Sequence, residues 1–240
     1  MNVATLIVIP TYNEAQSIAE LVVAVRASLP VAHVLIVDDA SPDGTADIVR
    51  RLASADSQVH LLERLGKLGL GSAYVAGFGW GLERGYQRFF EMDADFSHDP
   101  AELPAFVAAL DAGTDVVVGS RGVPGGDIRG WGPLRYLLSK GGSLYSRVVL
   151  GVGLRDLTTG FKAYSRRALE QIDLATLRSN GYAFQIETSY RALRQNLRVR
   201  EIPIVFVDRR AGESKMTSHE VWAAVVGVWL MRAGDRRSRP

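Results

Sequence analysis

The first half of the chain alternates short apolar runs with segments whose apolar residues recur at helical spacing. Between the first two runs, Ile18, Leu21, Val22, Val25 and Leu29 share one helical face. The runs have the length of buried strands and lie at 5–9, 34–37, 59–62, 89–92 and 116–118, with further helices expected over 45–52 and 72–84. This alternation predicts an α/β fold, with a Rossmann-like, mainly parallel sheet flanked by helices on both faces.

The second half is less regular. A Gly/Pro-rich segment over 122–132 predicts a loop, and 134–150 predicts an amphipathic helix that Gly141 and Gly142 should break. Helices are expected over 166–172, 183–195 and 218–231, a strand over 199–207 and a polar loop over 209–217. No repeat or linker interrupts the pattern. We therefore expect one domain over 1–220, followed by a C-terminal helix and basic tail over 221–240.

Length and composition narrow the class of protein. The chain has 240 residues, enough for one large α/β domain, and it contains no cysteine, which excludes disulfides and thiolate metal sites. The N-terminus shows no signal-peptide pattern. The apolar segment 221–231 would form a helix of roughly 16 Å, whereas a bilayer core is about 30 Å thick. We expect a cytoplasmic protein without a membrane span of its own.

The net charge is only +2, but the basic residues are unevenly distributed. Between residues 121 and 155 there are six basic residues and one acid, Asp127, interleaved with leucines and aromatic residues. Such a segment favours an anionic, amphiphilic ligand over an ordinary solvated surface. For the four arginines after residue 231, a solvated tail is an equally good interpretation. The four histidines do not have the spacing of metal ligands. No aromatic residues interleaved with basic ones suggest a base-stacking groove, so we expect no nucleic-acid partner.

Three short acidic motifs follow predicted strands at 10–14 (PTYNE), 38–45 (DDASPDGT) and 93–95 (DAD). In a parallel sheet, ligands gather at the carboxyl ends of the strands. Asp93 and Asp95 have the chemistry to hold Mg2+ or Mn2+ against a diphosphate. Taken alone, an Asp-x-Asp motif is weakly specific, and each of the first two motifs is also compatible with an ordinary capped turn.

Two further loops carry basic residues. The glycine-rich segment 66–71 lacks the Lys-Ser/Thr ending of a Walker motif, so only a basic residue near a phosphate is expected there. Arg209 and Lys215 bracket a polar loop that could close over a diphosphate and neutralise leaving-group charge. A solvated hairpin tip is the alternative interpretation.

Together these motifs resemble the family-2 inverting glycosyltransferases of the GT-A fold, and among them the dolichyl- or polyprenyl-phosphate mannosyltransferases. The resemblance covers roughly residues 4–220. Besides the motifs above, it rests on segments at 119–121 (GSR), 156–161 (DLTTGF), 181–187 (GYAFQIE) and 209–215. A set of this size is far more specific than any one of its members.

The resemblance implies a reaction and a set of site residues. GDP-mannose would be the donor and a polyprenyl monophosphate the acceptor, with Mg2+ or Mn2+ as cofactor. The metal would bind Asp93 and Asp95, and the phosphates would bind Arg209 and Lys215. The remaining donor residues would be Pro10, Tyr12, Glu14, Val37, Asp39, Ala94 and Ser97, although Ser97 stands where the family often has glutamine.

Residues Arg121, Arg135 and Ser139 would hold the acceptor phosphate, in agreement with the basic 121–155 segment. We expect peripheral binding to the cytoplasmic face of the membrane, directly or through a separate anchoring protein. Two alternatives stay open: another donor such as UDP-glucose, and a non-catalytic protein that binds a nucleotide sugar.

Overall fold

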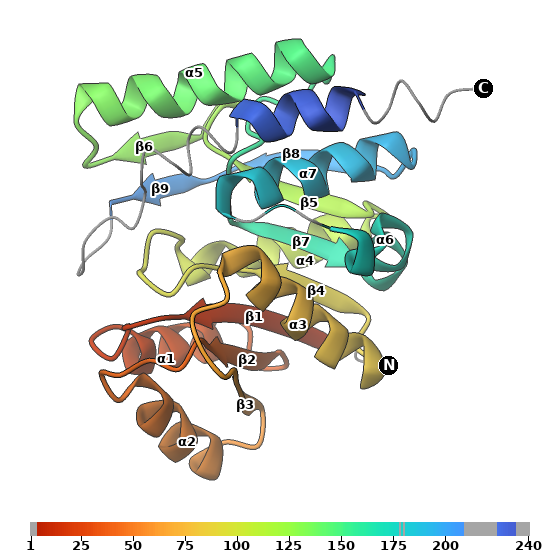
Figure 1. Cartoon of the computed structure of the whole chain (residues 1–240). Coiled ribbons are helices and arrows are strands. Elements are labelled where there is room, and N and C mark those ends of the chain that lie inside the picture. The colour runs from red at the N-terminus through yellow and green to blue at the C-terminus, as the bar shows by residue number, and fades with distance from the viewer. Residues whose placement is uncertain (1–3, 178, 180, 209–224, 234–240) are drawn as a thin grey trace.

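The computed structural model describes residues 4–177, 179, 181–208 and 225–233 (Figure 1). Its centre is a seven-stranded sheet in the order β3-β2-β1-β4-β7-β5-β8. The strands are β1 (Thr5–Thr11), β2 (His33–Asp38), β3 (Val59–Glu63), β4 (Arg88–Glu91), β5 (Val116–Ser120), β7 (Lys162–Ser165) and β8 (Val199–Pro203). Only β7 runs antiparallel to its neighbours, β4 and β5. The predicted mainly parallel sheet is therefore confirmed.

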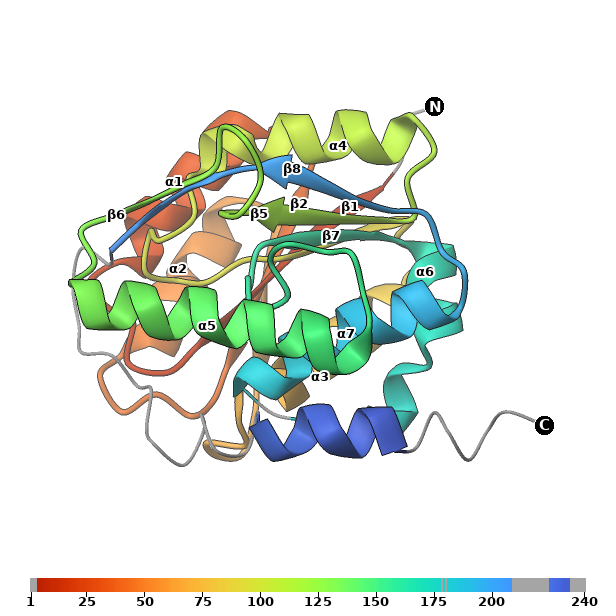
Figure 2. The ribbon, with the colours of Figure 1, turned by 90° about the horizontal axis from the view of Figure 1, so that it is seen from above.

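Helices cover both faces of this sheet, as Figure 2 shows from above. They are α1 (Ile18–Ser28), α2 (Thr45–Ala55), α3 (Leu70–Glu83), α4 (Leu103–Asp111), α5 (Pro133–Leu150), α6 (Arg166–Ile172) and α7 (Gly181–Arg194), with 3-10 turns at Pro100–Glu102 and Leu174–Thr176. Strand β1 alternates between two cores: Ile7 packs with residues of α1 and α4, whereas Val8 packs with residues of α3 and α7. A strand buried on both faces reads as a continuous apolar run, as residues 6–9 of β1 do.

Helix α3 lies unusually close to the sheet. A methyl group on Gly77 would come within 2.4 Å of the Val8 side chain, and one on Gly81 within 2.5 Å of Leu6. Glycine at these positions therefore allows the close approach, and α3 brings its N-terminal end near the carboxyl ends of β1 and β2.

Two predictions about strands in the second half were wrong. The expected loop 122–132 contains a strand, β6 (Asp127–Arg129), which pairs with β9 (Val205–Val207) in a small second sheet. The expected single strand over 199–207 divides at Ile204, whose N–H donates to Ser120 while its carbonyl accepts from Asp127. The chain thereby leaves β5 and joins β6, a change of partner that no local pattern encodes.

Helix α5 was also predicted wrongly in one respect, because it runs without a break through Gly141 and Gly142. Two interior glycines cost about 1 kcal/mol each relative to alanine. That cost is offset by packing, because Tyr145, Val149 and Leu150 join a third apolar cluster. Tertiary contacts thus outweigh propensity here.

The described end of the chain, residues 225–233, is helical and lies near α5 (Figures 1 and 2). Val228 is fully buried in the third cluster, with Leu150, Ile186 and Tyr190. The Tyr145 hydroxyl donates to the carbonyl of Val225 at 3.0 Å. This helix therefore packs on the same body as α5 and α7. The expected polar loop 209–217 lies outside the described residues.

Candidate active site

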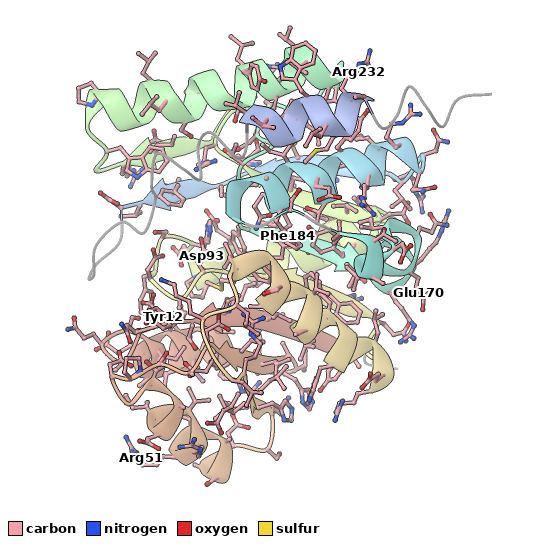
Figure 3. The ribbon with its side chains drawn as sticks, viewed as in Figure 1. Tyr12, Arg51, Asp93, Glu170, Phe184 and Arg232 are labelled. Carbon is pink, nitrogen blue, oxygen red and sulfur yellow. The ribbon has the colours of Figure 1, made fainter. Side chains whose placement is uncertain are left out.

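The three acidic motifs meet at one edge of the sheet, where the parallel strands β1, β2 and β4 end. Figure 3 shows Tyr12 and Asp93 on the same side of the molecule. Each motif region contains one non-glycine residue with a left-handed backbone: Asn13 (φ 60°), Ala40 (φ 54°) and Phe96 (φ 60°). Such conformations are uncommon and persist where surrounding contacts impose them. The three loops are therefore held in specified shapes.

The first contacts between the loops start at Asp38, which is buried. Its carboxylate accepts hydrogen bonds from the Thr11 hydroxyl at 2.8 Å and from both the hydroxyl and the N–H of Ser41, at 2.6 and 2.9 Å. These bonds satisfy a charge that would otherwise be costly to bury. Asp38 therefore joins the ends of β1 and β2.

The rest of the second motif supports the first. Asp43 accepts from the N–H of Ala15 at 3.0 Å, and Thr45 accepts from the N–H of Glu14 at 3.0 Å. Asp43 also accepts from the hydroxyl of Thr45 at 2.6 Å and from its N–H at 3.1 Å, at the first residue of α2. The polar residues of 41–45 thus form a support that presents Tyr12 and Glu14 at the sheet edge.

Asp39 is buried and holds the glycine-rich segment in place. Its carboxylate accepts from the Arg64 side chain at 2.5 Å and from the backbone N–H groups of Leu68 and Gly69 at 3.0 and 3.3 Å. Arg64 in turn donates to the Ser72 hydroxyl at 2.8 Å. Asp39 is therefore engaged in holding the entry to α3, and its expected contact with a nucleoside stays a prediction.

A basic residue of the same segment lies over the first motif. The ammonium group of Lys67 lies 4.4 Å from the centre of the Tyr12 ring, a cation–π geometry. Both residues belong to loops at the carboxyl edge of the sheet. Pro10, half-buried in β1, pairs in register with buried Val37 of β2 just below them. Four residues expected to bind the donor therefore lie together at the ends of β1 and β2 and in the loop after β1: Pro10, Tyr12, Glu14 and Val37.

The Asp93–Asp95 motif is open enough to bind a cation. The Asp93 side chain is 34% exposed, and Asp95 accepts a hydrogen bond from the N–H of Ser97 at 3.0 Å. A methyl group on Gly160 would come within 3.2 Å of the Asp93 carboxylate, so glycine there keeps the space beside it clear. Ala94 and Ser97 are both buried. Ser97 is thus a short, buried side chain at the position where the family often has glutamine.

The donor set of this motif fits a hard divalent ion. Within the described part of the chain, no group of three or more histidine, cysteine or acidic residues is arranged to hold a metal. Mg2+ and Mn2+ commonly bind through one or two carboxylates together with substrate phosphate oxygens. Asp93 and Asp95 match that incomplete type of site, in which the substrate completes the coordination.

Arg121 is buried and paired with Asp156, a residue that the sequence reasoning did not select. Its guanidinium donates to both Asp156 oxygens, at 2.7 and 2.8 Å, and to the Thr158 hydroxyl at 2.8 Å. Burial alone would raise the pKa of Asp156, but the Arg121 charge and the hydrogen bonds outweigh it and lower this pKa to about 2. The 156–161 segment was singled out by resemblance, but its pairing with Arg121 had no sequence signal.

The other expected acceptor residues lie on α5. Ser139 is half-buried there, and neighbouring Lys140 donates to the Arg121 carbonyl at 2.9 Å. Arg135 lies near the start of α5, and its side chain is outside the described part of the structure. Arg209 and Lys215 lie outside the described residues altogether. The structure therefore brings Arg121 and α5 together, whereas the expected binding of the donor phosphates by Arg209 and Lys215 stays a prediction.

A family model described as Glycosyl transferase family 2 matches residues 6–173. The chain belongs to glycosyl transferase family 2. It is 48% identical over 238 residues to the polyprenol monophosphomannose synthase of Mycolicibacterium smegmatis, covering 98% of this chain and 90% of that protein. It is also 48% identical over 223 residues to the undecaprenyl-phosphate mannosyltransferase of Micrococcus luteus, covering 93% and 91% of the two chains.

Solved structures agree with this fold. The glucosyl-3-phosphoglycerate synthase of Mycobacterium tuberculosis in complex with phosphoglyceric acid matches 96% of this family-2 chain and 80% of that chain, with a TM-score of 0.70 at 20% identity. A complex of the same enzyme with Mn2+, UDP and glucosyl-3-phosphoglycerate matches with a TM-score of 0.69. At this identity the likeness confirms the GT-A-like fold of the chain.

Proposed function

We propose that this glycosyltransferase moves mannose from GDP-mannose to a polyprenyl monophosphate, with inversion, and releases GDP. The observation that carries the proposal is a site with two half-buried carboxylates, Asp93 and Asp95, in a chain 48% identical along most of its length to two enzymes named for transfer to polyprenyl phosphates. The product would be a polyprenyl-phosphate β-mannose, because inversion of an α-linked donor yields the β anomer.

The donor would bind at the sheet edge. Tyr12 offers a face for a base, Glu14 an acceptor for base or ribose, and Lys67, over Tyr12, a cation for the nearer phosphate. Pro10, Val37 and Asp39 would complete the nucleoside site, with Asp39 acting in part by holding the glycine-rich segment. Arg209 and Lys215 would close on the diphosphate, and they stay a proposal from the sequence.

Asp93 and Asp95 would hold Mg2+ or Mn2+, which when bound would stabilise negative charge on the departing diphosphate. The complexes of the glucosyl-3-phosphoglycerate synthase with Mn2+ and a uridine nucleotide support a divalent ion in this fold. The structure adds the clear space that Gly160 leaves beside the Asp93 carboxylate.

The acceptor chemistry requires little proton transfer. A phosphate monoester is already anionic at neutral pH, so its oxygen can attack the anomeric carbon without a strong general base. One carbon–oxygen bond forms while the bond to the diphosphate breaks, and GDP leaves with that electron pair. The protein then contributes orientation, charge stabilisation and exclusion of water. Arg121, Arg135 and Ser139 would hold the acceptor phosphate, with Arg121 positioned by Asp156.

The acceptor is a membrane lipid, and we propose that the protein binds the cytoplasmic membrane face through α5 and the helix over 225–233. Leu137 and Val148 of α5 are 68% and 73% exposed, and Trp229 and Leu230 of the last helix are 58% and 66% exposed. Neither segment contains an acidic residue, whereas both contain basic ones. In the described part of the structure, no helix is long and apolar enough to cross a bilayer. An apolar face with only positive charges is suited to an anionic bilayer surface.

A panel of labelled nucleotide sugars tests the reaction. With polyprenyl phosphate and Mn2+ or Mg2+, we expect mannose from GDP-mannose to enter the lipid phase, and chelation or Asp95→Ala to abolish transfer. Label from UDP-glucose instead would establish the alternative donor. Nucleotide binding without any transfer would favour a non-catalytic protein, and unchanged turnover after chelation would contradict the metal role.

Flotation with phosphatidylglycerol vesicles tests the membrane face. We expect binding at low salt that weakens at high salt, and a several-fold loss in the double variant Leu137→Gln/Val148→Gln. Val23→Gln is the matched control, because Val23 is 62% exposed on α1, away from this face. If the wild type does not bind at low salt or at high salt, direct membrane contact is refuted and an anchoring protein is left as the route.

A further inference from the structure

His98 is a buried residue that contacts Asp93 of the proposed metal site. Its side chain is 1% exposed, and its Nε2 lies 3.2 Å from Oδ2 of Asp93. The ring stacks on Phe161 at 4.9 Å between centres and meets the edge of Phe206 at 5.4 Å. A histidine buried between two aromatic rings has little freedom to rotate, so its contact with Asp93 is imposed by packing.

The two aromatic rings are themselves anchored to different parts of the site. Phe161 follows Gly160, the residue that keeps the space beside Asp93 clear, and its carbonyl accepts from the N–H of Gly119 at 2.9 Å. Phe206 belongs to β9, whose Val207 donates its N–H to the Ser97 carbonyl at 3.2 Å. The position of the His98 ring is therefore set by the start of β7 and by β9 together.

The contacts also assign the proton on the ring. Nδ1 of His98 is buried and has no hydrogen-bond partner within the described residues, whereas Nε2 faces a carboxylate oxygen. A proton on Nδ1 would bury an unsatisfied donor, which is costly, while a proton on Nε2 is accepted by Asp93. A proton on Nε2 therefore fits this environment best.

We propose that His98 is a positioning residue, whose Nε2–H donates to Oδ2 of Asp93 and holds that carboxylate in the orientation in which it would bind the cation. The metal role of Asp93 rests on the proposed function, whereas the 3.2 Å contact between Nε2 of His98 and Oδ2 of Asp93 is shown by the structure. Partners that hydrogen-bond to metal ligands typically change metal affinity about 10- to 100-fold when they are lost. We expect a loss of that size here.

The test measures Mn2+ affinity in the presence of GDP, by electron paramagnetic resonance of free Mn2+, with full-length protein. His98→Phe keeps an aromatic ring between Phe161 and Phe206 but removes the donor, and His98→Gln restores an N–H donor. We expect the phenylalanine variant to bind Mn2+ about 10- to 100-fold more weakly and the glutamine variant to recover most of that loss. Thermal unfolding of the same samples reports whether each variant is folded.

Each outcome decides a different point. Wild-type affinity in folded His98→Phe overturns the positioning role while leaving the proposed function intact. Wild-type protein that binds GDP but not Mn2+ overturns the metal role itself, and the positioning role falls with it. If His98→Phe does not fold, His98→Met replaces it, because methionine and glutamine have similar length and differ in the amide donor. Equal Mn2+ affinity of the methionine and glutamine variants would then refute the proposal.

Discussion

The buried pair of Arg121 and Asp156 allows a quantitative prediction for Asp156→Asn. This change keeps the side-chain shape but removes the charge that compensates Arg121. The pKa of Asp156 falls from 3.8 to about 2 in the folded protein. This pKa difference is about 1.8, and one pKa unit corresponds to about 1.36 kcal/mol, so the ionised Asp156 contributes about 2.5 kcal/mol to the unfolding free energy. Removing one partner of a buried ion pair typically costs about 3–5 kcal/mol, which is the same order.

The pH dependence follows from the direction of this pKa change. Because the pKa of Asp156 is lower in the folded state, its contribution is present above about pH 4 and is lost as the pH falls through about 2. Urea unfolding at pH 7 should therefore show Asp156→Asn less stable by about 2–4 kcal/mol. The difference between wild type and variant should shrink between about pH 4 and pH 2.

Asp127→Asn is the matched control, because Asp127 pairs with Arg129 at 3.3 Å but both side chains are more than half exposed. Exposed ion pairs contribute about 0–1 kcal/mol, so this variant should unfold almost as the wild type does. A loss below about 1 kcal/mol for Asp156→Asn, or a loss of equal size at pH 7 and pH 2.5, would refute the reasoning.

Two further predictions concern stability. Gly77→Ala should lower the unfolding free energy by about 1–3 kcal/mol, because the new methyl group would meet the Val8 side chain at 2.4 Å. Gly79→Ala lies on the same helix, with no atom within 4 Å of the new methyl group, and should instead raise the unfolding free energy by up to about 1 kcal/mol. Urea unfolding of both variants tests these two predictions. A stabilised Gly77→Ala would contradict the close packing of α3 on β1. His33 and His60 stack with Nδ1 and Nε2 2.8 Å apart, and burial, with nearby positive charge, lowers the pKa of each. The contribution of this histidine pair to the unfolding free energy should be complete above about pH 6.5 and decline below it. The melting temperature of His60→Gln should therefore fall less between pH 7.5 and 5.5 than that of the wild type. An equal fall would exclude the histidine pair as the cause.

The sequence by itself determined the parallel strands and the position of the chemistry. Runs such as 6–9 are apolar at every position because both faces of the strand are buried, so local composition was enough to locate them. The acidic motifs follow β1, β2 and β4, and parallel strands bring their carboxyl ends to one edge whatever the details of packing. The gathering of Tyr12, Asp39 and Asp93 could therefore be predicted from order along the chain.

Only the tertiary structure decided what each polar residue binds. Asp38 and Asp39 are adjacent in sequence, yet one joins β1 to β2 while the other holds the glycine-rich segment. Arg121 meets Asp156 across 35 positions, and β6 meets β9 across a still longer separation. Local periodicity reports which face of an element is apolar, but hydrogen bonds between distant residues depend on where the chain returns. For that physical reason the edge of the sheet could be predicted, whereas the partners of its charges could not.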